Sequence, residues 1–160
     1  MARTLFTLNQ QVQSTLGMRR GATHTEYIRA HADGRFYFLE TAARVGGANI
    51  AEAVQYATGL DLWGEWARIE IAHLRGVPYQ LPAAKAGYSG VINCLARQEH
   101  PDLGAYNDPE VVWRLNKKHH AGLIVRSEDP KRVDELLDSY TGRFMADFYA
   151  FEPAPDRPSS

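Results

Sequence analysis

Two extended segments, residues 22–30 and 35–41, constrain the fold of this chain more than any other feature. The Asp33-Gly34 pair between them is typical of a tight β-hairpin turn. If the loop has three residues, beginning at Ala32 and with the glycine in the left-handed region, Glu26 lies directly opposite Glu40. A two-residue loop would instead send the two glutamates to opposite sides. The predicted register therefore depends on the turn.

The predicted hairpin gathers polar side chains on one face. Because side chains alternate along a strand, one side of the sheet carries His24, Glu26, Glu40 and Arg44. Directly opposed carboxylates repel each other, and a divalent cation removes this conflict, since magnesium is held by one or two carboxylates together with phosphate oxygens. The planar, permanently charged fork of Arg44 suits a phosphoryl group. The pattern predicts a phosphate-bound metal with Glu26 and Glu40 as ligands.

Each of these residues also has a purely structural explanation. The glutamates fit a solvent-exposed hairpin in which they never approach each other, and Arg44 alone fits a surface salt bridge. His24 faces Ala42 in this register, where it either leans toward the glutamates or fills the end of the strand. The pair Gly46-Gly47 marks either a turn or a close backbone approach to a ligand. The residue pattern alone leaves these alternatives open.

Patterns on both sides of the hairpin indicate an α+β fold, with an antiparallel sheet and flanking helices followed by a small α/β subdomain. Apolar residues recur at helical spacing up to Leu16, and Gly17 follows as a C-terminal cap. The expected elements are helices at residues 5–16, 49–57, 62–74 and 130–142 and strands at residues 88–97, 111–115 and 121–126. The proline-containing segment 78–87 reads as a linker. We therefore expect domains at residues 1–78 and 79–152 and a disordered tail at residues 153–160.

Composition excludes several classes of protein. The net charge is -1, and Lys and Arg are scattered among acidic residues, so there is no electrostatic footprint for a nucleic acid or an anionic membrane. No stretch approaches the ~20 apolar residues of a membrane span. Cys94 is the only cysteine, which excludes a disulfide framework. We expect a cytoplasmic protein with no nucleic-acid partner and no membrane partner.

The hairpin sequence resembles the C-terminal lobe of the ATP-grasp superfamily, to which biotin carboxylase and the amino-acid ligases belong. The resemblance covers about residues 15–75, and the motifs that carry it are Gly21-Ala22-Thr23-His24-Thr25-Glu26-Tyr27 and the run from Asp33 to Gly47. His24-x-Glu26 and the two glycines after Arg44 look most like the carboxylate-amine ligase branch. The resemblance implies that Glu26 and Glu40 hold magnesium, or manganese in its place, against the ATP phosphates. It also implies that Arg44 steadies the reacting carboxylate or acyl phosphate, and that the cofactor contacts Arg44, Gly46, Gly47 and His24.

The implied activity is ligation. ATP activates a small-molecule carboxylate as an acyl phosphate, which an amine or a similar nucleophile then attacks. Two departures qualify this expectation: Glu40-Thr41-Ala42 stands where the family often has Glu-x-Asn, and the family's nucleotide-gripping lobe has no counterpart in this sequence. The chain alone is expected to be inactive, with the missing lobe, a companion subunit or a second copy as partner. The alternative is a non-catalytic interaction or subunit module derived from an ATP-grasp protein.

Overall fold

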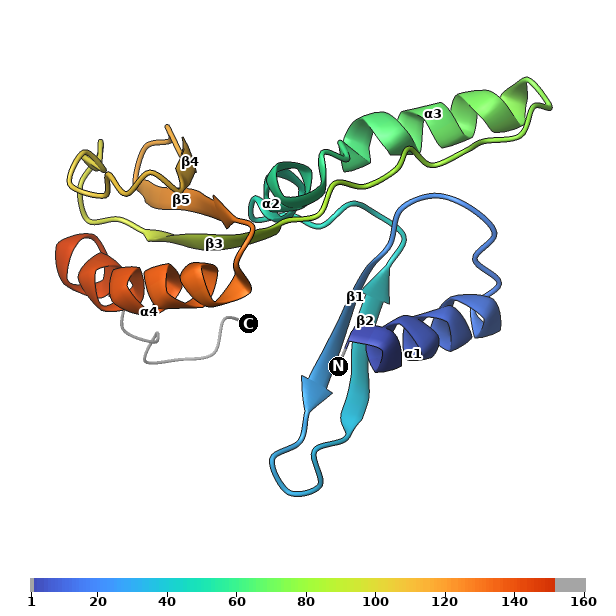
Figure 1. The fold of residues 1–160 in the computed structure, drawn as a ribbon, viewed down its shortest axis with the longest axis horizontal. Helices are drawn as coiled ribbons and strands as arrows, with labels where there is room; N and C mark the ends of the chain where they lie inside the picture. Colours follow the sequence, from blue (N-terminus) through green and yellow to red (C-terminus); the bar gives the residue numbers. More distant parts are fainter. Residues whose placement is uncertain (1, 152–160) are drawn as a thin grey trace, which may run out of the picture. The chain divides into compact units, whose positions relative to one another are not determined.

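The computed structural model describes residues 2–151, and the expected disordered tail, residues 153–160, lies outside them. The chain divides into two compact units (Figure 1). The first comprises Met1–Ala51 and Leu60–Ala83, and the second comprises Glu52–Gly59 and Ala84–Ser160. The predicted domain boundaries at residues 78 and 79 stay a prediction.

The fold is α+β with antiparallel strand pairing, as expected. The first unit contains α1 (Ala2–Thr15), β1 (His24–Arg29), β2 (Phe36–Ala42) and α3 (Leu62–Leu74). The second unit contains β3 (Tyr88–Leu95), β4 (Val111–Arg114), β5 (His120–Ser127), α4 (Pro130–Asp147) and all but the first two residues of α2 (Ile50–Thr58). None of the helices in the described part of the chain is long and apolar enough to cross a membrane.

Helix α1 ends as the sequence predicts. Gly17 adopts a φ of 69°, a left-handed conformation that glycine takes without steric cost. Its N–H donates to the Ser14 carbonyl at 3.1 Å, and the N–H of Met18 donates to the Gln13 carbonyl at 2.9 Å. These bonds satisfy carbonyls at the end of the helix that have no partner within it.

The hairpin confirms the predicted register at the glutamates but not the predicted loop. Glu26 pairs with Glu40, and Gly34 is left-handed with a φ of 68°. However, the N–H of Ala30 donates to the Arg35 carbonyl at 2.9 Å, so the loop has four residues, 31–34, and the three-residue prediction was wrong. An irregularity in the pairing between Glu26 and Tyr27, where Leu39 has no partner, restores the register. Toward the loop, Ile28 therefore faces Tyr37 rather than Phe38.

Helix α3 has the predicted bounds, whereas α2 differs at its start. The side chain of Asp61 caps α3 by accepting a hydrogen bond from the Trp63 N–H at 3.1 Å. Helix α2 begins at Ile50, one residue later than expected, and Asn49 has a φ of 64°. This left-handed conformation differs from the extended one of a helix N-cap, so Asn49, the first residue of the expected helix, is not an N-cap of α2.

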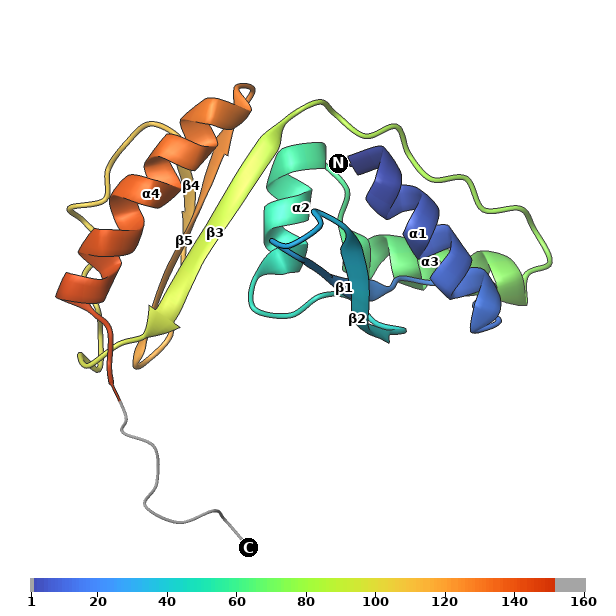
Figure 2. The ribbon, with the colours of Figure 1, turned by 90° about the horizontal axis from the view of Figure 1, so that it is seen from below.

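The second unit is a three-stranded sheet in the order β3-β5-β4, with α4 packed along one face (Figures 1 and 2). The central strand β5 contains a continuous buried run, residues 121–125, with a strand along each of its edges and α4 packed against it. On the helix side, the core is completed by Val133, Leu136, Tyr140, Phe144 and Phe148. This apolar stripe continues past Gly142, so α4 extends to Asp147 and the predicted stop at Gly142 was wrong.

Candidate functional site

The structure brings the two predicted metal ligands together on an exposed face of the hairpin. Glu26 and Glu40 are directly paired across β1 and β2, and Glu26 keeps 44% of its side chain exposed. Glu40 is also exposed. The Nδ1 atom of His24 lies 3.9 Å from Oε1 of Glu26, which is within ion-pair range but too long for a hydrogen bond. The imidazole of His24 therefore lies near the Glu26 carboxylate.

Helix α1 lies against the opposite face of the hairpin. Tyr27 and Phe38 pair on that face, with their rings in an edge-to-face contact at 6.0 Å between centroids. Tyr27 also lines a cavity with Phe6 and Asn9 of α1. Burial against the helix raises the pKa of the Tyr27 phenol. Because α1 occupies this side, the carboxylates on the other side stay open to a ligand.

The segment after β2 places Arg44 and the two glycines beside His24. A Cβ atom on Gly46 would lie 3.3 Å from Cδ2 of His24 and 3.1 Å from Cγ2 of Ile50, so only glycine fits this position without displacing them. A Cβ atom on Gly47 would have Nη1 of Arg44 as its nearest neighbour, at 3.8 Å. The Arg44 guanidinium also donates to the Val45 carbonyl at 3.2 Å. The close approach at Gly46 is thus to protein atoms, while the backbone at Gly47 remains exposed.

Two residues that were not among the predicted site residues add backbone strain at this point. Ala48 and Asn49 have φ values of 51° and 64°, left-handed conformations that cost an ordinary residue roughly 1–2 kcal/mol. They join Gly47 to the start of α2. Asparagine tolerates this conformation better than most residues, but nothing in the sequence distinguishes Ala48 from an ordinary loop alanine.

An apolar surface continues the face that carries the glutamates. Ile28 faces Tyr37, two positions along β1 from Glu26, and these side chains are 54% and 49% exposed. In the predicted register, with no irregularity at Leu39, Ile28 would instead have faced Phe38. One strand pair therefore presents two carboxylates followed by an apolar patch.

Among the described residues, no group of three or more His, Cys, Asp and Glu side chains is arranged to hold a metal ion. A paired set of two carboxylates fits magnesium, which keeps several water or phosphate oxygens in its coordination shell. It does not fit a closed structural zinc site, which needs four protein ligands. The donor set is therefore suited to a cation that arrives with a phosphate-bearing ligand.

No protein-family model and no curated protein sequence matches the chain. Solved structures share its fold, and two of them are ligases. Phosphoribosylglycinamide synthetase from Anaerococcus prevotii aligns with a TM-score of 0.53 and 15% identity over 92% of this chain and 41% of its own length. L-amino acid ligase from Bacillus licheniformis aligns with a TM-score of 0.59 and 14% identity over 96% of this chain and 42% of its own length.

Both neighbours are ATP-grasp ligases, and this chain spans about two fifths of their length, 41% and 42%. At 15% and 14% identity the likeness establishes the fold and not the activity. The chain therefore shares the fold of the aligned part of these two ligases, which is α+β with antiparallel sheets.

Proposed function

We propose that this chain supplies the metal- and phosphate-binding half of an ATP-grasp ligase. The observation that carries the proposal is the direct pairing of Glu26 with Glu40 on an exposed face of the hairpin. Two carboxylates that face each other without a basic residue between them repel, and a divalent cation between them and the ATP phosphates relieves the repulsion. Magnesium, or manganese in its place, would neutralise phosphate charge there.

Arg44 is proposed as the residue that contacts the reacting group. Its guanidinium lies over Gly47, beyond the end of β2, and its side chain is exposed. A planar fork of N–H donors binds two oxygens of a carboxylate or a phosphoryl group at once. In this role it would orient a carboxylate oxygen for attack on the γ-phosphorus, which releases ADP and forms an acyl phosphate. An amine would then attack the acyl carbon, with phosphate as the leaving group.

The remaining predicted residues would complete the cofactor contacts. The exposed backbone at Gly47 would approach the phosphates. Gly46 has no side chain, so the His24 ring would pack directly against the backbone of the loop. His24 would hydrogen-bond a carboxylate, a water or a phosphate oxygen rather than bind the metal directly, because magnesium prefers oxygen ligands. The apolar patch of Ile28 and Tyr37 offers a surface for a nucleotide base.

The rest of the enzyme is also part of the proposal. A chain that aligns with 41% and 42% of the neighbours leaves the remaining length of such a ligase to another segment or another chain. That part would grip the nucleotide from the other side, with a small-molecule carboxylate as substrate.

Magnesium-ATP titrated into the 15N-labelled chain tests this assignment by nuclear magnetic resonance. Amide resonances of Glu26, Glu40, Arg44 and Gly47 are expected to shift together. Arg44→Gln should weaken the response about tenfold, because a charged contact to the phosphates is lost. Arg35→Gln is the matched control, since Arg35 is exposed at the hairpin loop. An equal loss in both variants, or shifts only outside this face, would contradict the proposal.

A non-catalytic subunit module is the second candidate, and exposed apolar residues on both faces of the hairpin favour it. Ile28 and Tyr37 are 54% and 49% exposed on the face of the glutamates, Phe38 is 49% exposed on the face toward α1, and the unpaired Leu39 is 53% exposed. Large apolar patches generally mark an interaction surface. Association with a companion chain or a second copy, combined with no response to magnesium-ATP, would support this candidate over the first.

A further inference from the structure

A cavity of about 440 Å³ lies behind the hairpin, between the end of β2, the loop after α1 and helix α3. Thr41 and Ala43 contribute to its wall. Thr41 alternates with Glu40 and Ala42 along β2, so it faces away from the proposed metal site. The volume falls within the range of roughly 300–1,000 Å³ that is usual for small-molecule sites. The proposed function makes no use of this cavity.

A half-exposed ion pair forms part of the cavity wall. Nε of Arg20 donates to Oε2 of Glu70 at 3.1 Å, and the two side chains are 43% and 42% exposed. Such an exposed ion pair contributes little to the free energy of folding. Arg20 and Glu70 can therefore separate, and each can bind a charged group of a ligand, at a small cost in free energy. The next residue, Gly21, has a φ of 106°, and a Cβ atom there would lie 3.2 Å from Nε1 of Trp66 on α3.

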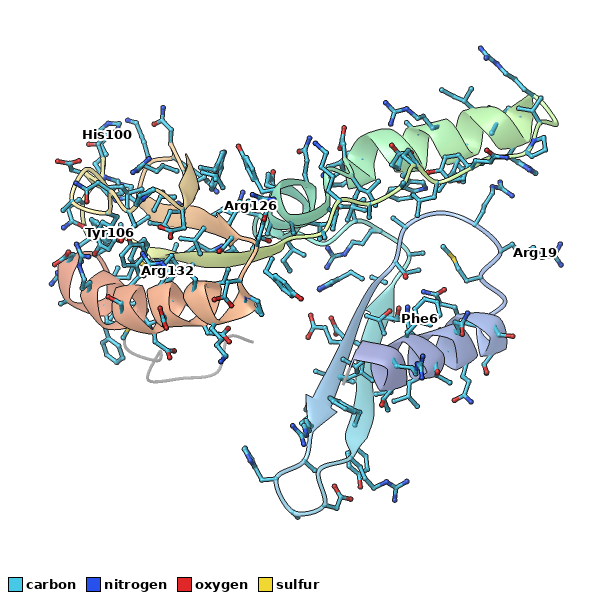
Figure 3. All side chains as sticks on the ribbon, viewed as in Figure 1. Phe6, Arg19, His100, Tyr106, Arg126 and Arg132 are labelled. Atoms are coloured by element: carbon cyan, nitrogen blue, oxygen red, sulfur yellow. The ribbon has the colours of Figure 1, made fainter. Side chains whose placement is uncertain are left out.

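The rest of the wall is uncharged apart from Arg19. Leu16 and Met18 supply apolar surface, and Gln13 donates from Nε2 to Oγ1 of Thr23 at 2.7 Å. This bond leaves the side-chain amide oxygen of Gln13 and the hydroxyl hydrogen of Thr23 available for a ligand. Arg19 projects from the loop (Figure 3) and, among the described residues, has no hydrogen-bond or ion-pair partner.

We propose that this cavity binds a free neutral amino acid in its zwitterionic form, with the carboxylate on Arg20 and the ammonium group on Glu70. A ligand with a single charge would leave the other member of the pair without a counter-ion, whereas a zwitterion replaces both halves of the ion pair. Leu16 and Met18 would contact an uncharged side chain. This site is distinct from the proposed metal face, so it extends the proposed function without depending on it.

Isothermal titration calorimetry of the 160-residue chain tests the ligand class, with no ATP or metal present. The probes are glycine, L-alanine, L-leucine and L-glutamine, together with two single-charge analogues of leucine, 4-methylpentanoate and 3-methylbutylamine. At least one amino acid is expected to bind saturably, and both analogues should bind at least about tenfold more weakly than leucine. Saturable binding by none of the four amino acids, or equal binding by either analogue, would overturn the proposal.

Variants and resonance shifts test the location. Arg20→Gln and Glu70→Gln should each weaken binding about tenfold, while Arg75→Gln removes the same charge from an exposed position after α3, outside the cavity wall, and should change binding less than about twofold. Thermal unfolding of each variant shows whether it folds, and in the unmodified chain the amino acid must shift the amide resonances of Thr41 and Ala43. An equal loss in Arg75→Gln would show unspecific attraction and overturn the assignment. Shifts confined to Glu26 and Arg44 would do the same, by placing the ligand on the metal face.

Discussion

The phenol of Tyr79 donates a hydrogen bond to Oε2 of Glu65 at 2.6 Å, and this bond fastens the segment after α3 to the helix. Glu65 is only 6% exposed, and its other carboxylate oxygen accepts a hydrogen bond from Arg68. Desolvation and the bond to Glu65 raise the pKa of Tyr79 to about 12, so the phenol remains a donor at neutral pH. Each oxygen of the buried Glu65 carboxylate therefore accepts a hydrogen bond from a side chain.

Tyr79→Phe is expected to lower the free energy of unfolding by about 1–2 kcal/mol, because it leaves one buried oxygen of Glu65 without its donor. Urea unfolding measures the change. Tyr88→Phe, at a position that is 50% exposed, serves as the control and should have little effect. Equal losses in the two variants would show that the bond to Glu65 contributes nothing specific.

Gly46→Ala is expected to destabilise the chain by about 1–3 kcal/mol, because the new methyl group would meet the side chains of Ile50 and His24 at 3.1 and 3.3 Å. Gly47→Ala is its matched control, since the same methyl group would lie 3.8 Å from its nearest neighbour, in ordinary contact. Chemical denaturation compares the two. Similar stability in both variants would contradict the tight packing of Gly46 against His24.

Acid should weaken the second unit through the carboxylates beside α4. The hydrogen bond from Tyr140, followed by that from Arg132, lowers the pKa of Asp108, and the hydrogen bonds from Arg132 lower the pKa of Glu110 (Arg132 is labelled in Figure 3). A carboxyl group with a lowered folded-state pKa stabilises the fold above its unfolded pKa of about 4, and the stabilisation disappears as the pH falls through the folded-state value.

The measurement is the free energy of unfolding between pH 7 and pH 2. Arg132→Gln should reduce stability at pH 7 and flatten its decline with acid, because it removes a cause of both pKa shifts. Lys131→Gln removes the same charge from the adjacent exposed position and should leave the pH profile unchanged. An unaltered acid profile in Arg132→Gln would contradict the assignment.

The pairing of Glu26 with Glu40 was predicted correctly because two errors in the predicted hairpin, in its loop length and in its strand pairing, cancelled each other. The loop is one residue longer than predicted, and the unpaired Leu39 restores the register before Glu40 is reached. A turn signal of Asp and Gly does not determine the loop length, and a pairing irregularity depends on the local twist of the strands, which no single residue type encodes. The pairing of Ile28 with Tyr37 therefore could not be predicted from the sequence.

Other elements were predictable where local chemistry determines them. The bounds of α3 follow from the capping carboxylate of Asp61 and the left-handed Gly76, whose φ is 64°. The end of α4 was missed because Gly142 reads as a stop signal, whereas burial of Phe144 and Phe148 carries the helix through it. Tertiary packing, which is not visible from spacing alone, decided that case.

Manganese binding to the 15N-labelled chain tests the central claim most directly. Bound manganese broadens nearby resonances, so the account predicts selective loss of the Glu26 and Glu40 amide signals at substoichiometric metal. Glu26→Gln and Glu40→Gln should each weaken the effect at least about tenfold, whereas Glu135→Gln, whose side chain is 69% exposed on α4, should leave it unchanged. Broadening that is uniform over exposed carboxylates, or that survives both hairpin substitutions, would contradict a metal site at Glu26 and Glu40.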